Sequence, residues 1–271
     1  MSSQTLQERL PQPTAAPFVS CTWVHRLAVD SDAYLHQTAP DASVELVCQV
    51  GEPVQVIGPQ QGPRAKLLPP GATVVGARFR PGSASALLGL PASELAALSI
   101  DAAELWGSRA ERLAERVARA TSPQAAVAEL ETAVHSQLAD ARPLDEPVAE
   151  MVRRVYADGA ASIAEIASSL YVSQRQLRRR CEAAVGLGPK ELQRIARFQR
   201  FLVLAERYRA SRATLASLAL QAGYADQAHL SRESVRLAGR APRELLLEAK
   251  QHCYGIHDHA ASDRQLFDAV A

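Results

Sequence analysis

The sequence has few of the features that mark secreted or membrane proteins. It contains only four cysteines in 271 residues, without a C-x-x-C pair, which favours a reducing compartment over a disulfide framework. No apolar run approaches the ~20 residues of a membrane span, and the polar N-terminus lacks the apolar core of a secretory signal. We therefore expect a cytoplasmic protein with no membrane contact.

Motifs for catalysis and cofactor binding are also missing. The sequence has no Gly-rich phosphate loop, no G-x-S-x-G and no H-E-x-x-H. His25 and His36 stand alone rather than in the His-x-His pair of a metal cupin. Four potential ligands gather only on the polar C-terminal tail: His252, Cys253, His257 and His259. Adventitious metal binding explains that cluster best, so we expect neither an enzyme nor a cofactor.

A net charge of +1 conceals a local excess of basic residues. Residues 151–250 contain 18 lysine and arginine residues against 9 acidic ones, and 16 of the 18 are arginine. Arginine suits bidentate contacts to phosphate and to guanine. A basic block alone also fits a solvated face or an RNA-binding patch. The sequence motif inside the block is therefore needed to distinguish these interpretations from DNA binding.

The basic block contains a helix-turn-helix signature twice, over residues 163–180 and 214–233. From the second helix of each copy onward, the two match at one constant offset. The matched pairs are Ser173 with Asp226, Leu177 with Leu230, Arg179 with Arg232, Gly186 with Gly239, and Pro189 with Pro242. A chain with two such units can grip DNA at two places without a partner subunit.

The first unit has its predicted reading surface at the start of its second helix. Two capping boxes mark helix starts: Ser162 with Glu165, and Ser173 with Gln176. A recognition helix enters the major groove by its N-terminal part. Gln174, Arg175, Arg178 and Arg179 fall there, while Leu177 faces inward. The arginines could contact guanine, at about 1–3 kcal/mol for each good pair, or only phosphate.

A long helix is predicted from Pro189 to about Arg207, holding the two recognition helices at a fixed separation. Asp226 is the expected cap of the second recognition helix. His229 fits a phosphate contact, a buried position or a merely polar one. The exposed edge of this helix is expected to be Gln227, Ala228, Ser231 and Arg232. Because Ala228 can touch only a thymine methyl, the DNA site should be asymmetric, with the first unit carrying more of the electrostatic grip.

These strings resemble the AraC/XylS family of bacterial transcription regulators over about Val148 to Glu248. The most specific string runs from Ala222 to Arg232. The resemblance implies two helix-turn-helix units that are joined by a linker helix and bind double-stranded promoter DNA, with RNA polymerase as a partner of an activator. In the family pattern the base contacts come from positions that match Arg175, Arg178, Arg179, Gln227, Ala228, Ser231 and Arg232.

Two equivalent positions depart from that pattern. The family usually has phenylalanine where this chain has Cys181 and Ser234, and a phenylalanine there would anchor the recognition helix in the core. Cys181 fills less space, and the Ser234 hydroxyl needs a partner when it is buried. Either the core is repacked or the units are less rigid without DNA.

The preceding part of the chain predicts strands followed by helices. β-branched runs at residues 43–50, 54–57 and 72–79 end at Gly or Pro, which favours a small antiparallel sheet or barrel. Amphipathic helices follow over 104–119 and from Pro123, either packed on the sheet or forming a dimer surface. The fold class is therefore α+β.

Four segments are expected. They are a flexible N-terminus at 1–17, a sensor or dimerisation domain at 18–142, a DNA-binding domain at 143–250 and a tail at 251–271. Residues 40–47 and 75–82 resemble an uncharacterised domain often joined to AraC-type DNA-binding domains, which implies a sensory or oligomerisation role.

Candidate effector contacts in this first domain are few. Arg78 and Arg80 share one face of a strand, where they could bind an anionic small-molecule effector or pair with Asp41 and Glu45. The aromatic side chains that could line a pocket, or simply pack in the core, are Trp23, Tyr34 and Trp106.

The leading hypothesis is a sequence-specific transcription regulator. Three rivals stay open: an N-terminal enzyme targeted to nucleic acid, a non-specific or architectural DNA binder, and a regulator whose N-terminal domain only forms homodimers. An enzyme would turn over a substrate, and an architectural protein would not prefer selected sites over random ones.

Overall fold

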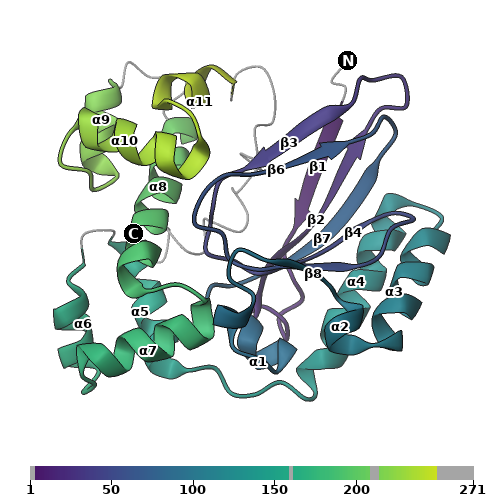
Figure 1. Cartoon of the computed structure of the whole chain (residues 1–271), viewed down its shortest axis with the longest axis horizontal. Coiled ribbons are helices and arrows are strands. Elements are labelled where there is room, and N and C mark those ends of the chain that lie inside the picture. The colour runs from purple at the N-terminus through teal and green to yellow at the C-terminus, as the bar shows by residue number, and fades with distance from the viewer. Residues whose placement is uncertain (1–3, 159–160, 208–213, 249–271) are drawn as a thin grey trace.

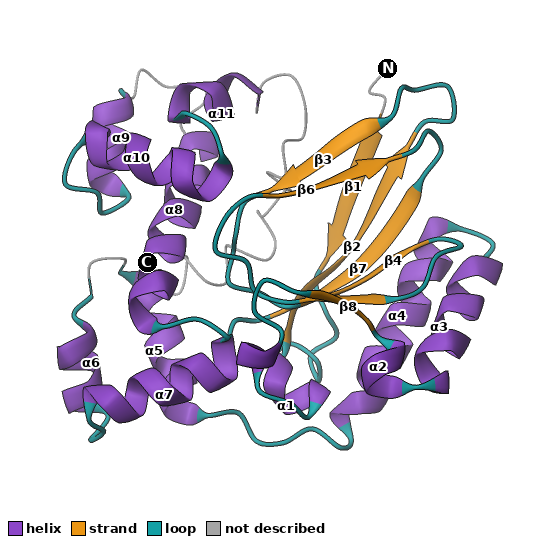
Figure 2. Cartoon of the chain, viewed as in Figure 1, coloured by secondary structure: helices purple, strands orange, loops and turns teal. Residues whose placement is uncertain are grey.

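The computed structural model describes residues 4–158, 161–207 and 214–248 (Figure 1). The first half is a β-sheet with helices against it, and the second half, as far as it is described, consists of helices (Figure 2). This confirms the predicted α+β class. The tail at 251–271, with its histidine and cysteine cluster, lies outside the described residues.

The main sheet has six strands in the order β1-β2-β7-β4-β5-β8, and every neighbouring pair is antiparallel. The predicted runs at 43–50, 54–57 and 72–79 correspond to β4, β5 and β7, so these predictions are confirmed. The strands are β1 Gln4–Arg9, β2 Val19–Leu27, β4 Glu45–Gln49, β5 Gln55–Ile57, β7 Thr73–Phe79 and β8 Ser99–Asp101.

Part of the N-terminal segment is a strand, although a flexible segment was predicted for residues 1–17. From Gln4 to Arg9 it forms β1, which pairs along its whole length with β2. Its polar side chains face partners: His25 Nε2 lies 2.8 Å from Gln4 Oε1, and Glu8 forms an ion pair with Arg78. The prediction is wrong for β1 because hydrogen bonds and a charge pair, with Leu6 as its one apolar contact to the core, attach this strand.

Helices cover one face of the sheet. α3 (Ser108–Arg119) and α4 (Pro123–Leu138) bury Leu113 and Leu130 against strand residues such as Leu46. Of the two predicted alternatives, packing on the sheet or forming a dimer surface, these contacts correspond to the first. Ser122 caps α4 by accepting from the Ala125 backbone N–H at 3.1 Å. The predicted helix at 104–119 is broken at Gly107 (φ 53°, ψ −137°), which separates the short α2 (Ala103–Trp106) from α3.

A two-stranded ribbon covers the opposite face. It pairs β3 (Tyr34–Thr38) with β6 (Arg64–Leu68), and it encloses a small core with Trp23 and Val74 of the main sheet. Gly76 lies opposite Trp23 in the register, and a methyl group there would lie 2.3 Å from the indole ring. Only glycine therefore lets the indole lie flat on this sheet.

This layer brings together two histidines that are isolated in the sequence. The rings of His25 and His36 are 5.0 Å apart, and Tyr34 meets His25 edge-on at 5.8 Å. Burial lowers the pKa of His25 to about 4. Burial, helped by the nearby charges of His25, Arg64 and Arg78, lowers the pKa of His36 to about 3. Both rings are therefore neutral near pH 7.

The second half carries the two predicted units at either end of one long helix (Figure 1). That helix, α8, spans Pro189–Arg207 as predicted. The remaining helices are α5 Glu146–Ala157, α6 Ile163–Ser169, α7 Gln174–Val185, α9 Leu215–Gln221, α10 Gln227–Ala238 and α11 Pro242–Glu248.

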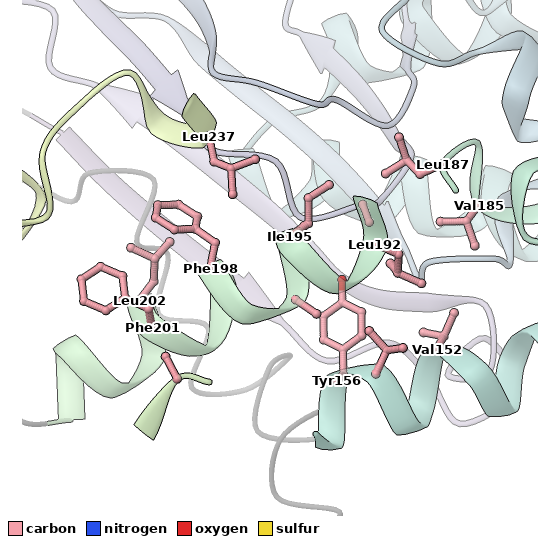
Figure 3. Packing of buried hydrophobic residues seen from close by; sticks show 14 of the residues in the cluster. Val152, Tyr156, Val185, Leu187, Leu192, Ile195, Phe198, Phe201, Leu202 and Leu237 are labelled. Carbon is pink, nitrogen blue, oxygen red and sulfur yellow. The ribbon is translucent and has the colours of Figure 1, made fainter. Parts of the chain in front are cut away.

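Phenylalanines from α8 fill the core of this half, away from the two positions where the family has them. Phe198 and Phe201 are fully buried, with ring centroids 6.1 Å apart (Figure 3). Cys181 is also buried, and its Sγ donates to the Leu187 carbonyl at 3.1 Å. Ser234 is fully buried, and its hydroxyl has no hydrogen-bond partner among the described residues. The core is thus closed at both positions, with one polar group left unpaired.

The two halves share this core through the segment Pro40–Ala42, which precedes β4. Gln199 Nε2 donates to the Pro40 carbonyl at 2.8 Å, and the Tyr156 hydroxyl donates to the Asp41 carbonyl at 2.8 Å. Ala42 has φ 61° and is buried within the helical core. Two small helices, α1 (Ala84–Leu88) and η1 (Ala92–Glu94), also contact α7.

Ser234→Ala should stabilise the protein by about 1 kcal/mol, because it removes an unpaired buried hydroxyl and favours the helix. Chemical denaturation of the variant and the parent measures this difference. Ser168→Ala, at an exposed position of α6, is the control that changes helix propensity alone. A loss of stability in Ser234→Ala would mean that the hydroxyl has a partner.

Stability should fall as the pH is lowered through the ordinary histidine range. The unfolded chain takes up protons on His25 and His36 below about pH 6.5, whereas the folded chain resists this until about pH 4 and pH 3, so acid favours unfolding. The Tm of the parent should therefore drop between about pH 7.5 and about pH 5. The double variant His25→Gln, His36→Gln should show a smaller drop, and the exposed control His135→Gln should match the parent. Equal slopes for the parent and the double variant would contradict this assignment.

Candidate nucleic-acid interface

The first recognition helix, α7, begins at the predicted capping box. Ser173 Oγ accepts from the Gln176 backbone N–H at 3.2 Å, and Gln176 Oε1 accepts from the Ser173 N–H at 2.9 Å. Leu177 is fully buried. These contacts hold the first turn of α7 in place and leave its outer face in solvent. At Ser162 the side chain accepts from the Glu165 N–H at 3.3 Å and caps α6.

The outer face of α7 is basic and exposed, as predicted. Gln174, Arg175, Arg178 and Arg179 are all exposed. Arg178 forms an ion pair with Glu182 one turn later at 2.7 Å, whereas neither Arg175 nor Arg179 pairs with any carboxylate of the described residues. These two guanidinium groups are therefore free to meet a ligand.

A further cation adjoins this face, and sequence reasoning did not select it. Lys190 is exposed in the first turn of α8, and it lines one depression together with Gln174, Arg175 and Arg178. We call these four residues the first basic surface. The duplication contains a signal for Lys190, because the residue at the same offset in the second copy, Arg243, is also basic and follows Pro242 as Lys190 follows Pro189.

The second recognition helix, α10, is built in the same way. Asp226 Oδ1 accepts from the His229 backbone N–H at 2.6 Å, which confirms the predicted cap. The ring of His229 is half-buried, and its centroid lies 5.2 Å from that of Tyr224, nearly perpendicular to it. Gln227, Ala228 and Arg232 are exposed, and the half-buried Ser231 hydroxyl donates to the Gln227 carbonyl at 2.9 Å. His229 thus packs within the unit rather than pointing freely outward.

Ion pairs fasten α10 to the linker helix. Arg194 of α8 forms two hydrogen bonds to Glu233, at 2.7 and 2.8 Å, and a third to Glu191 at 3.0 Å. The hydrogen bonds from Arg194 hold the pKa of Glu233 below its ordinary value. Arg180 likewise pairs with Asp145, the cap of α5, at 2.7 Å. These arginines hold the fold together and are not available to DNA.

The predicted effector residues are divided by the structure. Arg78 is buried and forms ion pairs with Glu45 at 2.9 Å, Asp41 at 3.1 Å and Glu8 at 3.5 Å. It therefore has the second of its two predicted roles, that of a partner for Asp41 and Glu45. Arg80 Nε donates to the Ala16 carbonyl at 2.6 Å. Neither guanidinium is presented to an effector.

The structure instead has a cavity of about 270 Å³ between the main sheet and the β3–β6 ribbon. Trp23 lines it as predicted, whereas Tyr34 packs on the histidine pair beside it. Trp106 lies on α2, on the helical side of the sheet. The cavity also has two cationic lining residues, Arg64 and Lys66 on β6, which were not predicted from the sequence.

Two further observations concern sites of other kinds. The described residues contain no group of three or more side chains that could hold a metal ion. None of the helices in the described ranges is both long and apolar enough to cross a bilayer.

Comparison with known proteins identifies both halves. Residues 7–101 match the model of a domain of unknown function, DUF6597, and residues 166–247 match that of a helix-turn-helix domain. No curated protein matches the chain.

The fold is also similar to solved structures of ToxT from Vibrio cholerae. For ToxT from strain O395 the identity is 12%, the TM-score is 0.46, and the match covers 93% of this chain and 100% of that one. For unsaturated-fatty-acid-bound wild-type ToxT from strain SCE256 the values are 14%, 0.44, 91% and 96%. At these scores the likeness says nothing about ligands. The helix-turn-helix match and the duplicated units nevertheless agree on one conclusion: the chain is a DNA-binding transcription regulator that joins a DUF6597 domain in its N-terminal half to an AraC-type helix-turn-helix domain.

Proposed function

We propose that α7 and α10 read promoter DNA through their exposed first turns and that the protein acts by binding, without a catalytic step. The observation that carries this proposal is the sorting of the arginines. The half-buried arginines are engaged within the fold: Arg180 and Arg194 pair with carboxylates, and Arg200 donates to the Ala157 carbonyl. Arg175, Arg179 and Arg232 are exposed on the recognition helices and have no carboxylate partner among the described residues.

The linker helix supports simultaneous contact by both units. α8 has 19 residues, which corresponds to a length of about 28 Å. Recognition helices that read successive major grooves must lie roughly 34 Å apart. Units attached at the two ends of a helix of this length, the second of them fixed to it by the Arg194–Glu233 pair, can meet that requirement on one face of a duplex.

The residues of the interface divide into two roles in this proposal. Arg175, Arg179 and Arg232 meet base edges, together with the polar Gln174 and Gln227. Of the remaining predicted contacts, Arg178, Ala228 and Ser231 approach the backbone or the base surface, whereas His229 packs on Tyr224 and supports the helix. Lys190 joins them as a phosphate contact beside the positive N-terminal end of α8.

Control of this binding is proposed to come from the N-terminal half. The cavity between the sheet and the ribbon is the sensor site, because both cationic and aromatic side chains line it. A second copy of the chain and RNA polymerase remain predicted partners.

Arg179→Ala and Arg232→Ala should each weaken binding to a selected DNA site by about 10-fold or more, because a bidentate base contact is worth about 1–3 kcal/mol. Each should also relax base preference at one position of the site. Lys190→Ala should instead weaken binding evenly across sequences and reduce the salt slope by about 1. Sites selected from random duplexes, followed by titrations at several salt concentrations, measure all three effects.

Arg153→Ala is the matched control, because Arg153 is an exposed arginine of the same half that pairs with Glu150 on α5. It should bind as the parent does. If Arg179→Ala and Arg232→Ala also bound selected sites as the parent does, the assigned reading surface would be wrong. A parent protein with equal affinity for selected and random duplexes would be an architectural binder instead.

A further inference from the structure

The cavity between the main sheet and the ribbon has one cationic wall. Arg64, Lys66 and Leu68 are every second residue of β6, so their side chains face the same way. Lys66 lies opposite His36 in the register. Both cations are half-buried and line the cavity. Neither forms an ion pair with a described carboxylate, and burial lowers the pKa of Arg64. Their charges therefore lack the compensation that buried cations ordinarily have.

Two carboxylates also line the cavity, Glu45 and Glu52, and the charge of Glu45 favours the cationic form of Arg64 without forming an ion pair with it. Glu45 is bound by Arg78 at 2.9 Å. Glu52 is exposed. The histidines His25 and His36 are neutral near pH 7, since burial lowers their pKa values to about 4 and about 3. An anion bound at the ribbon would consequently meet two cations that have no ion-pair partner among the described residues, while one carboxylate is already held by Arg78 and the other lies at the exposed edge.

The opposite wall is apolar and aromatic. The indole of Trp23 lies over Gly76 and is almost fully buried. Val47, Ile57 and Val74 of the main sheet line the cavity beside it. A volume of about 270 Å³ lies near the lower end of the range of small-molecule sites, about 300–1,000 Å³. The space suits a flat apolar group rather than a sugar or a nucleotide.

We propose that this cavity binds a small organic carboxylate, with the carboxylate between Arg64 and Lys66 and the apolar body against Trp23. The inference rests on the proposed sensor role of the N-terminal half and gives it a ligand class. Arginine presents a planar pair of donors to a carboxylate, and the lysine adds a second charge. The cations that bind the anion are thus on the ribbon, whereas the sequence pointed to Arg78 and Arg80.

The chain offers a direct optical test because it has only two tryptophans. In the full-length Trp106→Phe variant, Trp23 is the sole tryptophan and its emission reports on the cavity. Phenylacetate and octanoate should change that emission saturably, and the neutral phenylacetamide should not. Arg64→Gln and Lys66→Gln should each raise the Kd for the carboxylates by about 10-fold. The control is Arg26→Gln, which removes an exposed cation from the same strand as Trp23 and should leave the Kd for the carboxylates unchanged.

Several outcomes would overturn the proposal. One is that neither carboxylate changes the Trp23 emission saturably up to about 1 mM. Another is that phenylacetamide binds as tightly as phenylacetate. A third is that Arg64→Gln and Lys66→Gln both retain the parent's Tm and the parent's Kd for the carboxylates. Binding of inorganic phosphate without either carboxylate would also overturn it, because the apolar wall would then have no role. Site-selective DNA binding is measured separately, so a chain that binds its DNA site but no carboxylate would refute this inference and leave the regulator intact.

A different observation carries a second inference, about the spacing of the recognition helices. One loop of the N-terminal half, residues 58–63 between β5 and β6, contacts the ends of both helices. α7 ends at Gly186 and α10 ends at Gly239, the equivalent residues of the two copies, and both are left-handed, with φ 79° and 71°. A methyl group on Gly186 would lie 2.6 Å from Pro59 Cγ, and one on Gly239 would lie 3.5 Å from Pro63 Cγ.

The loop itself is firmly held at its first end. The Gly58 N–H donates to the Leu98 carbonyl at 2.9 Å, and the Pro59 carbonyl accepts from the Ala97 N–H at 3.0 Å. A methyl on Gly58 would lie 1.7 Å from the Leu95 carbonyl oxygen, so only glycine fits there. Proline fixes the backbone at both contact points. The loop is therefore a stiff connection between two equivalent points of the duplicated units.

We infer that Pro59 and Pro63 are positioning residues that fix the separation of the two recognition helices and hence the half-site spacing the protein prefers. Neither proline needs to touch DNA for this. The loop leads directly into Arg64, so it also joins the proposed carboxylate site to both units. The consequence is a spacing preference that depends on a loop outside the helix-turn-helix domain.

The test uses selected half-sites separated by spacers that differ by one base pair. The parent should prefer one spacing, and the double variant Pro59→Ala, Pro63→Ala should reduce that preference over the neighbouring spacings by about fivefold. The base preference within each half-site should not change. The control is Pro69→Ala, Pro70→Ala, which removes two exposed prolines from a turn of the same half.

A lower affinity with the same spacing profile would show that the prolines only stabilise the fold and would overturn the inference. A double variant identical to the parent in both properties would overturn it as well. The Tm of each variant, measured first, separates these outcomes from unfolding.

Discussion

The arrangement of the two halves depends on one buried arginine. Arg78 of β7 is enclosed by the carboxylates of Glu8, Asp41 and Glu45, which come from β1 and from the start of β4 with the loop before it. An unpaired buried charge costs several kcal/mol, so each carboxylate is held where it neutralises the guanidinium. This attaches β1 to the sheet and sets the position of the loop before β4. A residue that resembled an effector contact in the sequence is thus the centre of the fold.

The same loop connects that charge cluster to the helical half. Asp41 faces Arg78 with its side chain, while its backbone carbonyl accepts from Tyr156. One residue on either side, Pro40 accepts from Gln199 and Ala42 enters the helical core. The sheet is therefore fixed to α5 and α8, the helices that support both recognition helices. A ligand that moved the sheet or the ribbon would act on a single packed body rather than through a flexible linker.

Local signals in the sequence predicted the helical half well. The caps Ser173 and Asp226 and the extent of α8 all follow from residues within one or two turns of chain, so a single sequence contains the necessary information. The N-terminal half depends on partners far along the chain. β1 is polar and becomes a strand only because β2 offers its edge, and His25 meets His36 only after the ribbon folds over the sheet. Neither pairing leaves a trace in the spacing or composition of its own segment.

The charge of the basic block illustrates the same limit at the candidate site. Its arginines look alike in the sequence, yet Arg180 and Arg194 fasten helices to one another while Arg175 and Arg179 face solvent. The charge available to DNA is therefore smaller than the composition of residues 151–250 suggests. What remains is unequal: the first basic surface combines two arginines and Lys190 around one depression, whereas of the two exposed arginines of α10 only Arg232 lacks a carboxylate partner among the described residues, since Arg236 lies 3.8 Å from Glu191. Since phosphate attraction scales with the number of cations that contact the backbone, the proposed interface gives the first unit more of the hold on the duplex and the second unit more of the selectivity.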